Sequence, residues 1–108
     1  MEIAGYPSYS DVMKPVTLVA TIQARPGKET EVRKLLEGLV PPTRKEAGCI
    51  NYDLHVAEDD GGRFLFYENW ASHAAIDAHG ETPHIKNLLA RVDELCSEFK
   101  LTYWQKTG

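Results

Sequence analysis

The sequence predicts an α+β fold of the ferredoxin-like type, in which a four-stranded antiparallel sheet carries its helices on one face. Four segments show the two-residue alternation of apolar and polar side chains that is typical of strands. Two longer regions between them place apolar residues at the spacing of an amphipathic helix. The order along the chain is strand, helix, strand, strand, helix, helix, strand, which is a β-α-β-β-α-β pattern with a divided second helix.

Length and composition limit the class of protein. A chain of 108 residues with 43% apolar and 26% charged residues is typical of one globular domain. The net charge of −4 and the absence of a basic run argue against nucleic acid and anionic membranes as partners. No apolar stretch approaches the roughly 18 residues of a membrane span. The N-terminus does not resemble a signal peptide, and two cysteines without metal-type spacing indicate reduced thiols, so we expect a cytoplasmic protein.

The chain divides into three parts. Residues 1–15, with Tyr6-Pro7, Tyr9 and Pro15, follow neither a helical nor a strand period, and we expect an N-terminal leader that is either irregular or an arm lying on a partner subunit. Residues 16–106 make up the predicted domain. Residues 107–108 form a short tail.

The first strand and helix precede Gly48. Residues 16–24 alternate as a strand, and the turn at residues 25–27 leads into a helix predicted from Lys28 to about Val40. Pro41 and Pro42 lack N–H groups and are expected to interrupt this helix, which resumes as a kinked stretch over residues 43–47. Gly48 is expected to close it as a left-handed cap.

Residues 49–57 and 63–70 are predicted to form a hairpin, because a short glycine-rich turn joins two alternating segments. The second of these strands carries large side chains on both faces. One layer of helices covers only one face of a sheet, so a second copy of the chain is the simplest cover for the other. The sequence therefore predicts a homodimer.

Two helices and a strand complete the domain. Ser72 can cap a short helix over residues 73–79, and Thr82 can cap a second one that has Pro83 at its first position. An apolar stripe continues along this second helix to residue 96. Residues 99–105 alternate as the last strand.

Several motifs together resemble the antibiotic biosynthesis monooxygenase superfamily, in its quinol monooxygenase-type branch of dimeric α+β barrels. The motifs are Arg25-Pro26-Gly27-Lys28, Gly48-Cys49 with Tyr52 and Leu54, Phe64 with Tyr67-Glu68 and Trp70, and His79 followed by Thr82-Pro83-His84. The resemblance implies a homodimer that needs no cofactor. It also implies a small aromatic substrate, a quinol or phenol, which is oxidised by molecular oxygen.

Such a reaction needs a proton acceptor, a donor for the developing oxyanion and dry aromatic walls. A helix N-terminus favours neutral His84, which suits a base, and a helix C-terminus favours charged His79, which suits a donor, but either can accept the substrate proton. The aromatic and polar residues of the hairpin can shape the pocket, although they also fit an ordinary core. The candidate catalytic residues are His84 and His79, and the candidate substrate-binding residues are Trp70, Tyr52, Phe66, Tyr67, Asn51 and Glu68.

The sequence does not favour a metal or haem. His79 and His84 are not spaced as a helical pair of ligands, and haem-degrading relatives place their iron ligand in the region of residues 88–90, where this chain has no histidine. Two other functions stay open. One is an isomerase of a small phosphorylated or hydroxylated metabolite, with Lys86 and Arg91 as phosphate anchors, and the other is a non-catalytic dimeric small-molecule-binding stress protein.

Overall fold

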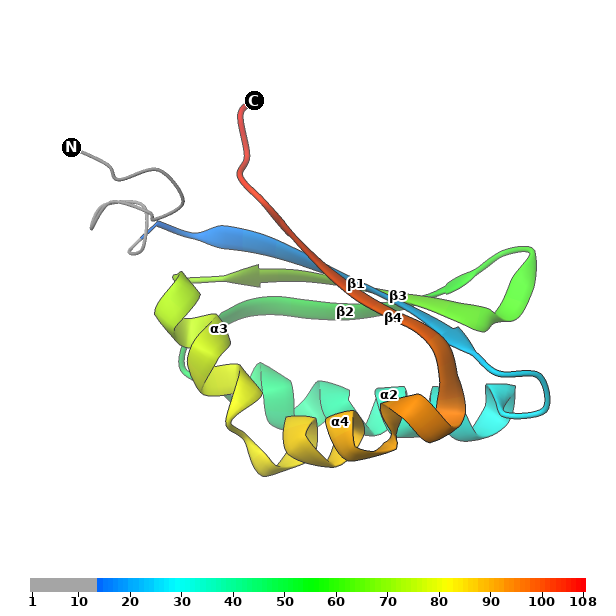
Figure 1. Ribbon diagram of the computed structural model, residues 1–108. Helices are drawn as coiled ribbons and strands as arrows, with labels where there is room; N and C mark the ends of the chain where they lie inside the picture. Colours follow the sequence, from blue (N-terminus) through cyan, green and yellow to red (C-terminus); the bar gives the residue numbers. More distant parts are fainter. Residues whose placement is uncertain (1–13) are drawn as a thin grey trace.

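A computed structural model describes residues 14–108, in which one antiparallel sheet carries three helices on a single face (Figure 1). The strands are β1 (Val16–Ala24), β2 (Cys49–Ala57), β3 (Asp60–Trp70) and β4 (Cys96–Trp104), and the helices are α2 (Glu29–Arg44), α3 (His73–Gly80) and α4 (Pro83–Leu95). The predicted leader falls almost wholly in residues 1–13, outside the described residues. None of the helices in residues 14–108 is long and apolar enough to cross a membrane.

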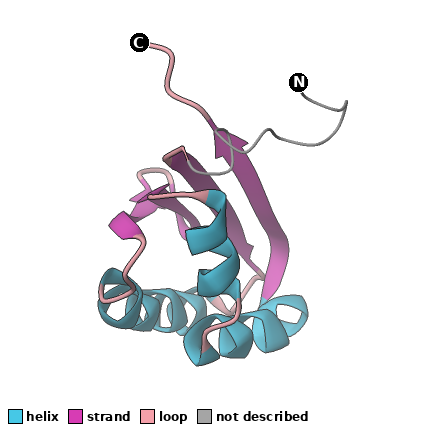
Figure 2. Cartoon of the chain, turned by 90° about the vertical axis from the view of Figure 1, so that its left-hand side faces the viewer, coloured by secondary structure: helices cyan, strands magenta, loops and turns pink. Residues whose placement is uncertain are grey.

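The strand order β2-β3-β1-β4 is that of the predicted ferredoxin-like fold, with β1 in the middle of the sheet. The view in Figure 2 shows the helices gathered on one side of the strands, and Figure 1 shows α2 and α4 side by side beneath the sheet. β1 is buried at every second residue, from Val16 to Ala24, which confirms the predicted alternation. The fold class is therefore as the sequence indicated.

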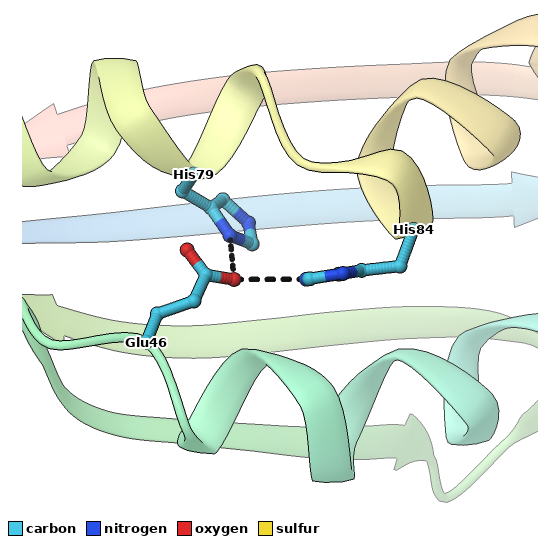
Figure 3. A group of neighbouring side chains, drawn as sticks. All are labelled: Glu46, His79 and His84. Carbon is cyan, nitrogen blue, oxygen red and sulfur yellow. Dashed lines mark hydrogen bonds and ion pairs between the residues drawn. The ribbon is translucent and has the colours of Figure 1, made fainter.

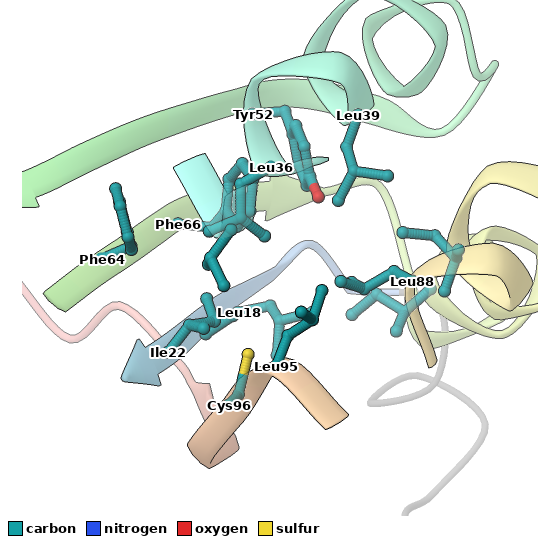
Figure 4. Close-up of a cluster of buried hydrophobic side chains, with 14 of the residues drawn as sticks. Leu18, Ile22, Leu36, Leu39, Tyr52, Phe64, Phe66, Leu88, Leu95 and Cys96 are labelled. Carbon is teal, nitrogen blue, oxygen red and sulfur yellow. The ribbon is translucent and has the colours of Figure 1, made fainter. Parts of the chain in front are cut away.

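The core lies between the helix-facing side of the sheet and the helices (Figure 4). α2 contributes Leu36 and Leu39, and β3 contributes Phe64 and Phe66, all with 3% or less of their surface exposed. Burial of such side chains is the main stabilising term, at about 25 cal/mol per Å² of apolar surface.

Helix α2 differs from the prediction, because it continues through Pro41 and Pro42 to Arg44. The two missing N–H groups would have bonded the carbonyls of Glu37 and Gly38, which are exposed residues whose carbonyls water can reach. The prolines therefore remove two bonds on the solvent side without ending the helix.

Gly48 is not the left-handed cap that we expected. Gly27 is the only residue of positive φ in the described part of the chain. Gly48 instead lies under α3, where an added Cβ would come within 2.2 Å of the Ala75 Cβ atom. A glycine is needed here because α3 approaches the backbone so closely.

Strand ends also differ from the prediction. β3 begins at Asp60 instead of Arg63, and β4 begins at Cys96 directly after α4 instead of at Phe99. The hydrogen bond from Arg25 N–H to the Leu95 carbonyl ties the end of α4 to the end of β1, which fixes this direct entry. The caps were predicted correctly: Ser72 accepts from the Ala75 N–H and Thr82 from the Ile85 N–H.

The opposite face of the sheet exposes large apolar groups, including Ile50 at 61%, Tyr67 at 45% and Trp104 at 57%. This is the face that we expect a second copy of the chain to cover. The homodimer remains a prediction.

Candidate active site

A cavity of about 440 Å³ lies between the helix-facing side of the sheet and helices α3 and α4. Its size is within the range of small-molecule sites. Most of its walls are aliphatic or aromatic, and a few polar groups converge on it. The apolar lining residues are Leu18, Ala20, Phe66, Ile76, Ile85, Leu88, Leu89, Phe99 and Leu101, and the polar ones are Tyr52, Glu68, Asp77, His79, Glu81 and Tyr103.

The sheet register places four of these residues in one row. Tyr52 pairs with Glu68, Glu68 with Leu18, and Leu18 with Tyr103. Paired residues in antiparallel strands point to the same face, so all four side chains face the helices. The Tyr52 ring stacks on Phe66, with ring centroids 4.4 Å apart.

Glu68 is a buried carboxyl group in the wall of the cavity, with 2% of its surface exposed. Its Oε1 atom accepts a 2.8 Å hydrogen bond from the indole N–H of Trp70. Burial raises the pKa of Glu68 to about 7, the Trp70 hydrogen bond opposes the shift, and the Glu46 carboxylate adds to it. Near neutral pH the group is therefore partly protonated and can donate a hydrogen bond into the cavity.

Tyr52 supplies a second potential donor. Burial, reinforced by the nearby Glu68, raises the pKa of Tyr52 far above its ordinary value. Its hydroxyl group therefore stays neutral at physiological pH.

His79 ends α3 and has 7% of its surface exposed. Its Nδ1 atom lies 2.8 Å from Oε2 of Glu46, and its ring centroid lies 4.6 Å from that of Trp70. Burial lowers the pKa of His79, and the hydrogen bond to Glu46 opposes this shift. The neutral imidazole is therefore favoured.

His84, in the first turn of α4, reaches the same oxygen: its Nε2 atom also lies 2.8 Å from Oε2 of Glu46. Figure 3 shows the two rings approaching this oxygen from α3 and α4, while Glu46 reaches toward them from the turn after α2. Three segments that are distant in sequence thus meet at one carboxylate.

The hydrogen-bond partners assign the tautomers. The Thr82 hydroxyl donates to the His79 carbonyl at 2.7 Å, so its oxygen can only accept from His84 Nε2, which lies 3.3 Å away. His84 Nε2 therefore carries a proton and donates to Glu46. His79 Nδ1 must likewise donate to this carboxylate. The Nε2 atom of the neutral ring then carries no proton and keeps a lone pair, and His79 lines the cavity. This Nε2 atom has no hydrogen-bond partner among residues 14–108.

The structure brings four of the eight candidate residues together at the cavity: His79, Glu68, Tyr52 and Phe66. The other four lie elsewhere. Trp70 is fully buried behind the wall, and its N–H, which we expected to face a substrate oxygen, donates to Glu68.

Asn51 and Tyr67 lie on the opposite face of the sheet, where the Asn51 side chain donates to Asp53 and to the Tyr67 carbonyl. The period-two alternation of β2 and β3 puts them there. His84 does not line the cavity and is connected to it through Glu46, which in turn contacts His79.

Glu46 is the residue that the sequence did not reveal. It follows the last turn of α2 and belongs to no periodic pattern or motif. The one available signal was indirect, because a buried histidine needs a hydrogen-bond partner. The sequence contains many acidic residues and does not say which of them is close.

Residues 15–91 match the sequence profile of the family described as "Antibiotic biosynthesis monooxygenase". The chain belongs to this family. The resemblance seen in its motifs is thereby confirmed, and membership implies a small-molecule substrate and oxygen.

Individual relatives agree with this assignment. "Putative monooxygenase Rv0793" of Mycobacterium tuberculosis is 40% identical over 81 residues, covering 75% of this chain and 79% of the relative. "Probable quinol monooxygenase YgiN" of Escherichia coli K12 is 33% identical over 81 residues, covering 66% of this chain and 78% of the relative. The crystal structure of PA3566 from Pseudomonas aeruginosa superposes with a TM-score of 0.85 at 34% identity, covering 90% of this chain and 98% of that one. Both of these curated relatives carry names that describe a monooxygenase.

Proposed function

We propose that the protein is a cofactor-independent monooxygenase that oxidises a small quinol or phenol with molecular oxygen in the cavity described above. One observation carries the proposal: His79, which lines a largely apolar cavity, is anchored through Nδ1 to Glu46, while its Nε2 atom has no hydrogen-bond partner among residues 14–108. A carboxylate that holds one ring nitrogen fixes both the tautomer and the orientation of the ring. The other nitrogen then acts as a base.

The reaction begins with transfer of the substrate O–H proton to His79 Nε2. The phenolate is a better one-electron donor than the phenol, and it reduces oxygen to superoxide. The phenoxyl radical and superoxide combine at a ring carbon, and His79 returns its proton to the resulting peroxide. Loss of the ring hydrogen as a proton and cleavage of the O–O bond give a quinone and water. One oxygen atom enters the product, and the substrate supplies all the electrons.

The cavity walls favour these steps. Leu18, Ile85 and Leu88 are apolar and exclude water, which would otherwise separate the radical pair. Glu68 in its protonated form and the Tyr52 hydroxyl can donate hydrogen bonds to a substrate oxygen. In this proposal His84 positions Glu46, and His79 is the proton acceptor.

The isomerase alternative lacks support at the cavity. Lys86 forms an ion pair with Glu81 and Arg91 with Glu31, and neither cation lines the cavity. A phosphate group inside would therefore meet no lysine or arginine among the described lining residues, and it would lie near the acidic Glu68, Asp77 and Glu81.

Oxygen uptake tests the proposal. We expect the chelator-treated protein to consume oxygen with some members of a panel of hydroquinones, naphthohydroquinones and phenols, and to release water and a quinone that contains one oxygen atom more than the substrate. His79→Gln should lower kcat by about 10²–10⁴-fold, which is the usual contribution of a general base. His55→Gln is the matched control, because His55 is an exposed histidine outside the cavity. Equal rates for His79→Gln and the wild type would rule out His79 as the base.

A further inference from the structure

We propose that Glu46, His79 and His84 form a binding site for a divalent transition-metal ion of the Zn²⁺ type, and that the bound ion switches off the base function of His79. The three residues offer one ligand atom each, all within 4.8 Å of one another. Two imidazole nitrogens and a carboxylate oxygen are a donor set that suits Zn²⁺ and Co²⁺. The first half of the proposal stands on this geometry, and the second half rests on the proposed function.

The distances fit a tetrahedral ion after small movements. Zn–N and Zn–O bonds of about 2.0–2.1 Å at tetrahedral angles place neighbouring donors about 3.3 Å apart. The two contacts of Glu46 Oε2 are 2.8 Å, and the widest ligand separation is no more than 4.8 Å. The two short contacts must therefore open by about 0.5 Å, and the widest separation must close by up to about 1.5 Å.

Burial and charge also suit an ion. The side chains of His79, Glu46 and His84 are 8%, 16% and 20% exposed, so the site is shielded but not sealed from solvent. One carboxylate and two neutral imidazoles leave a bound dication with a net charge of +1, and water can complete the coordination. Trp70 packs against the His79 ring, with ring centroids 4.6 Å apart, and restricts its movement.

The sequence argued against a metal on the spacing of His79 and His84 alone. That argument applies to two ligands on one helix. Here the histidines belong to two helices, α3 and α4, and the third ligand comes from the turn after α2. The sheet and helices bring them together, so local spacing does not decide the question.

The predicted consequence for His79 follows from its two ring nitrogens. The Nδ1 atom now donates a proton to Glu46. A metal ion bound at Nδ1 takes the place of this proton, and a neutral imidazole must then carry its proton on Nε2. An Nε2–H group donates but cannot accept, so the ion inhibits the oxidation.

Metal titration of the tag-free protein tests the site without reference to activity. Co²⁺ added to chelator-treated protein should give the visible absorption of a tetrahedral ion with one Co²⁺ per chain, and Zn²⁺ should displace it. His84→Gln and Glu46→Gln should each weaken Co²⁺ binding at least tenfold, as loss of a ligand requires, and His55→Gln should not. Binding that none of these changes weakens would overturn the site.

A second measurement uses the wild type alone, so that a poorly folding variant does not decide the matter. The imidazole ¹⁵N signals should report Zn²⁺ at Nδ1 of His79 and at Nε2 of His84, because these atoms face Glu46. Zinc at the other nitrogens, or no change on addition of Zn²⁺, would overturn the proposal.

Oxygen uptake then tests inhibition by the metal separately from metal binding. Inhibition by Zn²⁺ that chelator reverses supports the second half, and full activity of the zinc-loaded protein refutes it. If no quinol is oxidised by metal-free protein while Co²⁺ binds as expected, the proposed function fails and the metal site stands.

Discussion

Replacing Glu68 with glutamine should change how the stability of the protein depends on pH. Glu68 is 2% exposed, and its only hydrogen-bond partner in residues 14–108 is the Trp70 indole. Glutamine keeps an oxygen that can accept this bond and has nearly the same volume, but it cannot ionise. The substitution therefore removes one titration and little else.

The sign and size of the effect follow from two pKa values. The carboxyl group has an ordinary pKa of 4.5, which applies to the unfolded chain, and burial raises its pKa to about 7 in the folded protein. Between these values the folded protein holds a proton that the unfolded chain has lost. Each pH unit of increase then favours unfolding by about 1.4 kcal/mol. The wild type should therefore lose about 3 kcal/mol relative to Glu68→Gln as the pH rises through this interval.

Urea denaturation of both proteins between pH 4.5 and pH 8.5 measures this difference. Groups that do not interact with Glu68 contribute equally to both proteins and cancel when their free energies of unfolding are subtracted. With an m value of about 1.5 kcal/mol/M, the midpoints should change relative to one another by about 2 M. Protein concentration is held constant, because self-association would add its own stabilisation. Curves that stay parallel within about 0.5 kcal/mol would show that Glu68 ionises normally in the folded protein, and the burial argument would be wrong.

Two further substitutions test local packing and capping. Gly48→Ala should lower the free energy of unfolding by about 1–3 kcal/mol, because the added Cβ atom would meet Ala75. Gly38→Ala is the control: it lies at an exposed helix position with nothing within 4 Å, and it should raise the free energy of unfolding by about 0.5–1 kcal/mol. Thermal or urea unfolding measures both changes, and equal free energies of unfolding for the two variants would refute the close approach of α3 to Gly48. Thr82→Ala should lower the free energy of unfolding by about 1 kcal/mol, because the Ile85 N–H at the start of α4 loses its acceptor. Thr82→Ser keeps the hydroxyl group and should keep most of the stability, so an equal decrease in both variants would exclude the cap.

The strands and caps were predictable because their signals are local. Alternation along β1 records directly which side chains face the core, and it matches the observed burial residue by residue. Ser72 and Thr82 also act through bonds to residues three positions away, so the sequence contains everything that the interaction needs. The fold class followed from the order of such elements.

Features that depend on contacts between distant segments were not predictable in this way. Pro41 and Pro42 break a helix in general, but here the bonds that they remove lie on an exposed side. The role of Gly48 depends on Ala75, which is 27 positions away in the chain. Glu46 meets His79 and His84 across separations of 33 and 38 residues. Without the packed fold, nothing distinguishes it from the other acidic residues.

The two carboxyl groups near the cavity have complementary hydrogen-bonding roles. Glu46 accepts two N–H groups on one oxygen, and so it holds His79 as a proton acceptor. Glu68 lies in the sheet, where burial raises its pKa to about 7 and keeps much of it protonated near neutral pH. Environments that separate two carboxyl groups in this way often divide the acid and base roles of a site. Under the proposed function, a quinol would meet an acceptor on the helix side and a donor on the sheet side. Activity would then fall as the pH rises above the pKa of Glu68, because the carboxyl group loses the proton that it donates. Glu68→Gln therefore tests catalysis as well as stability.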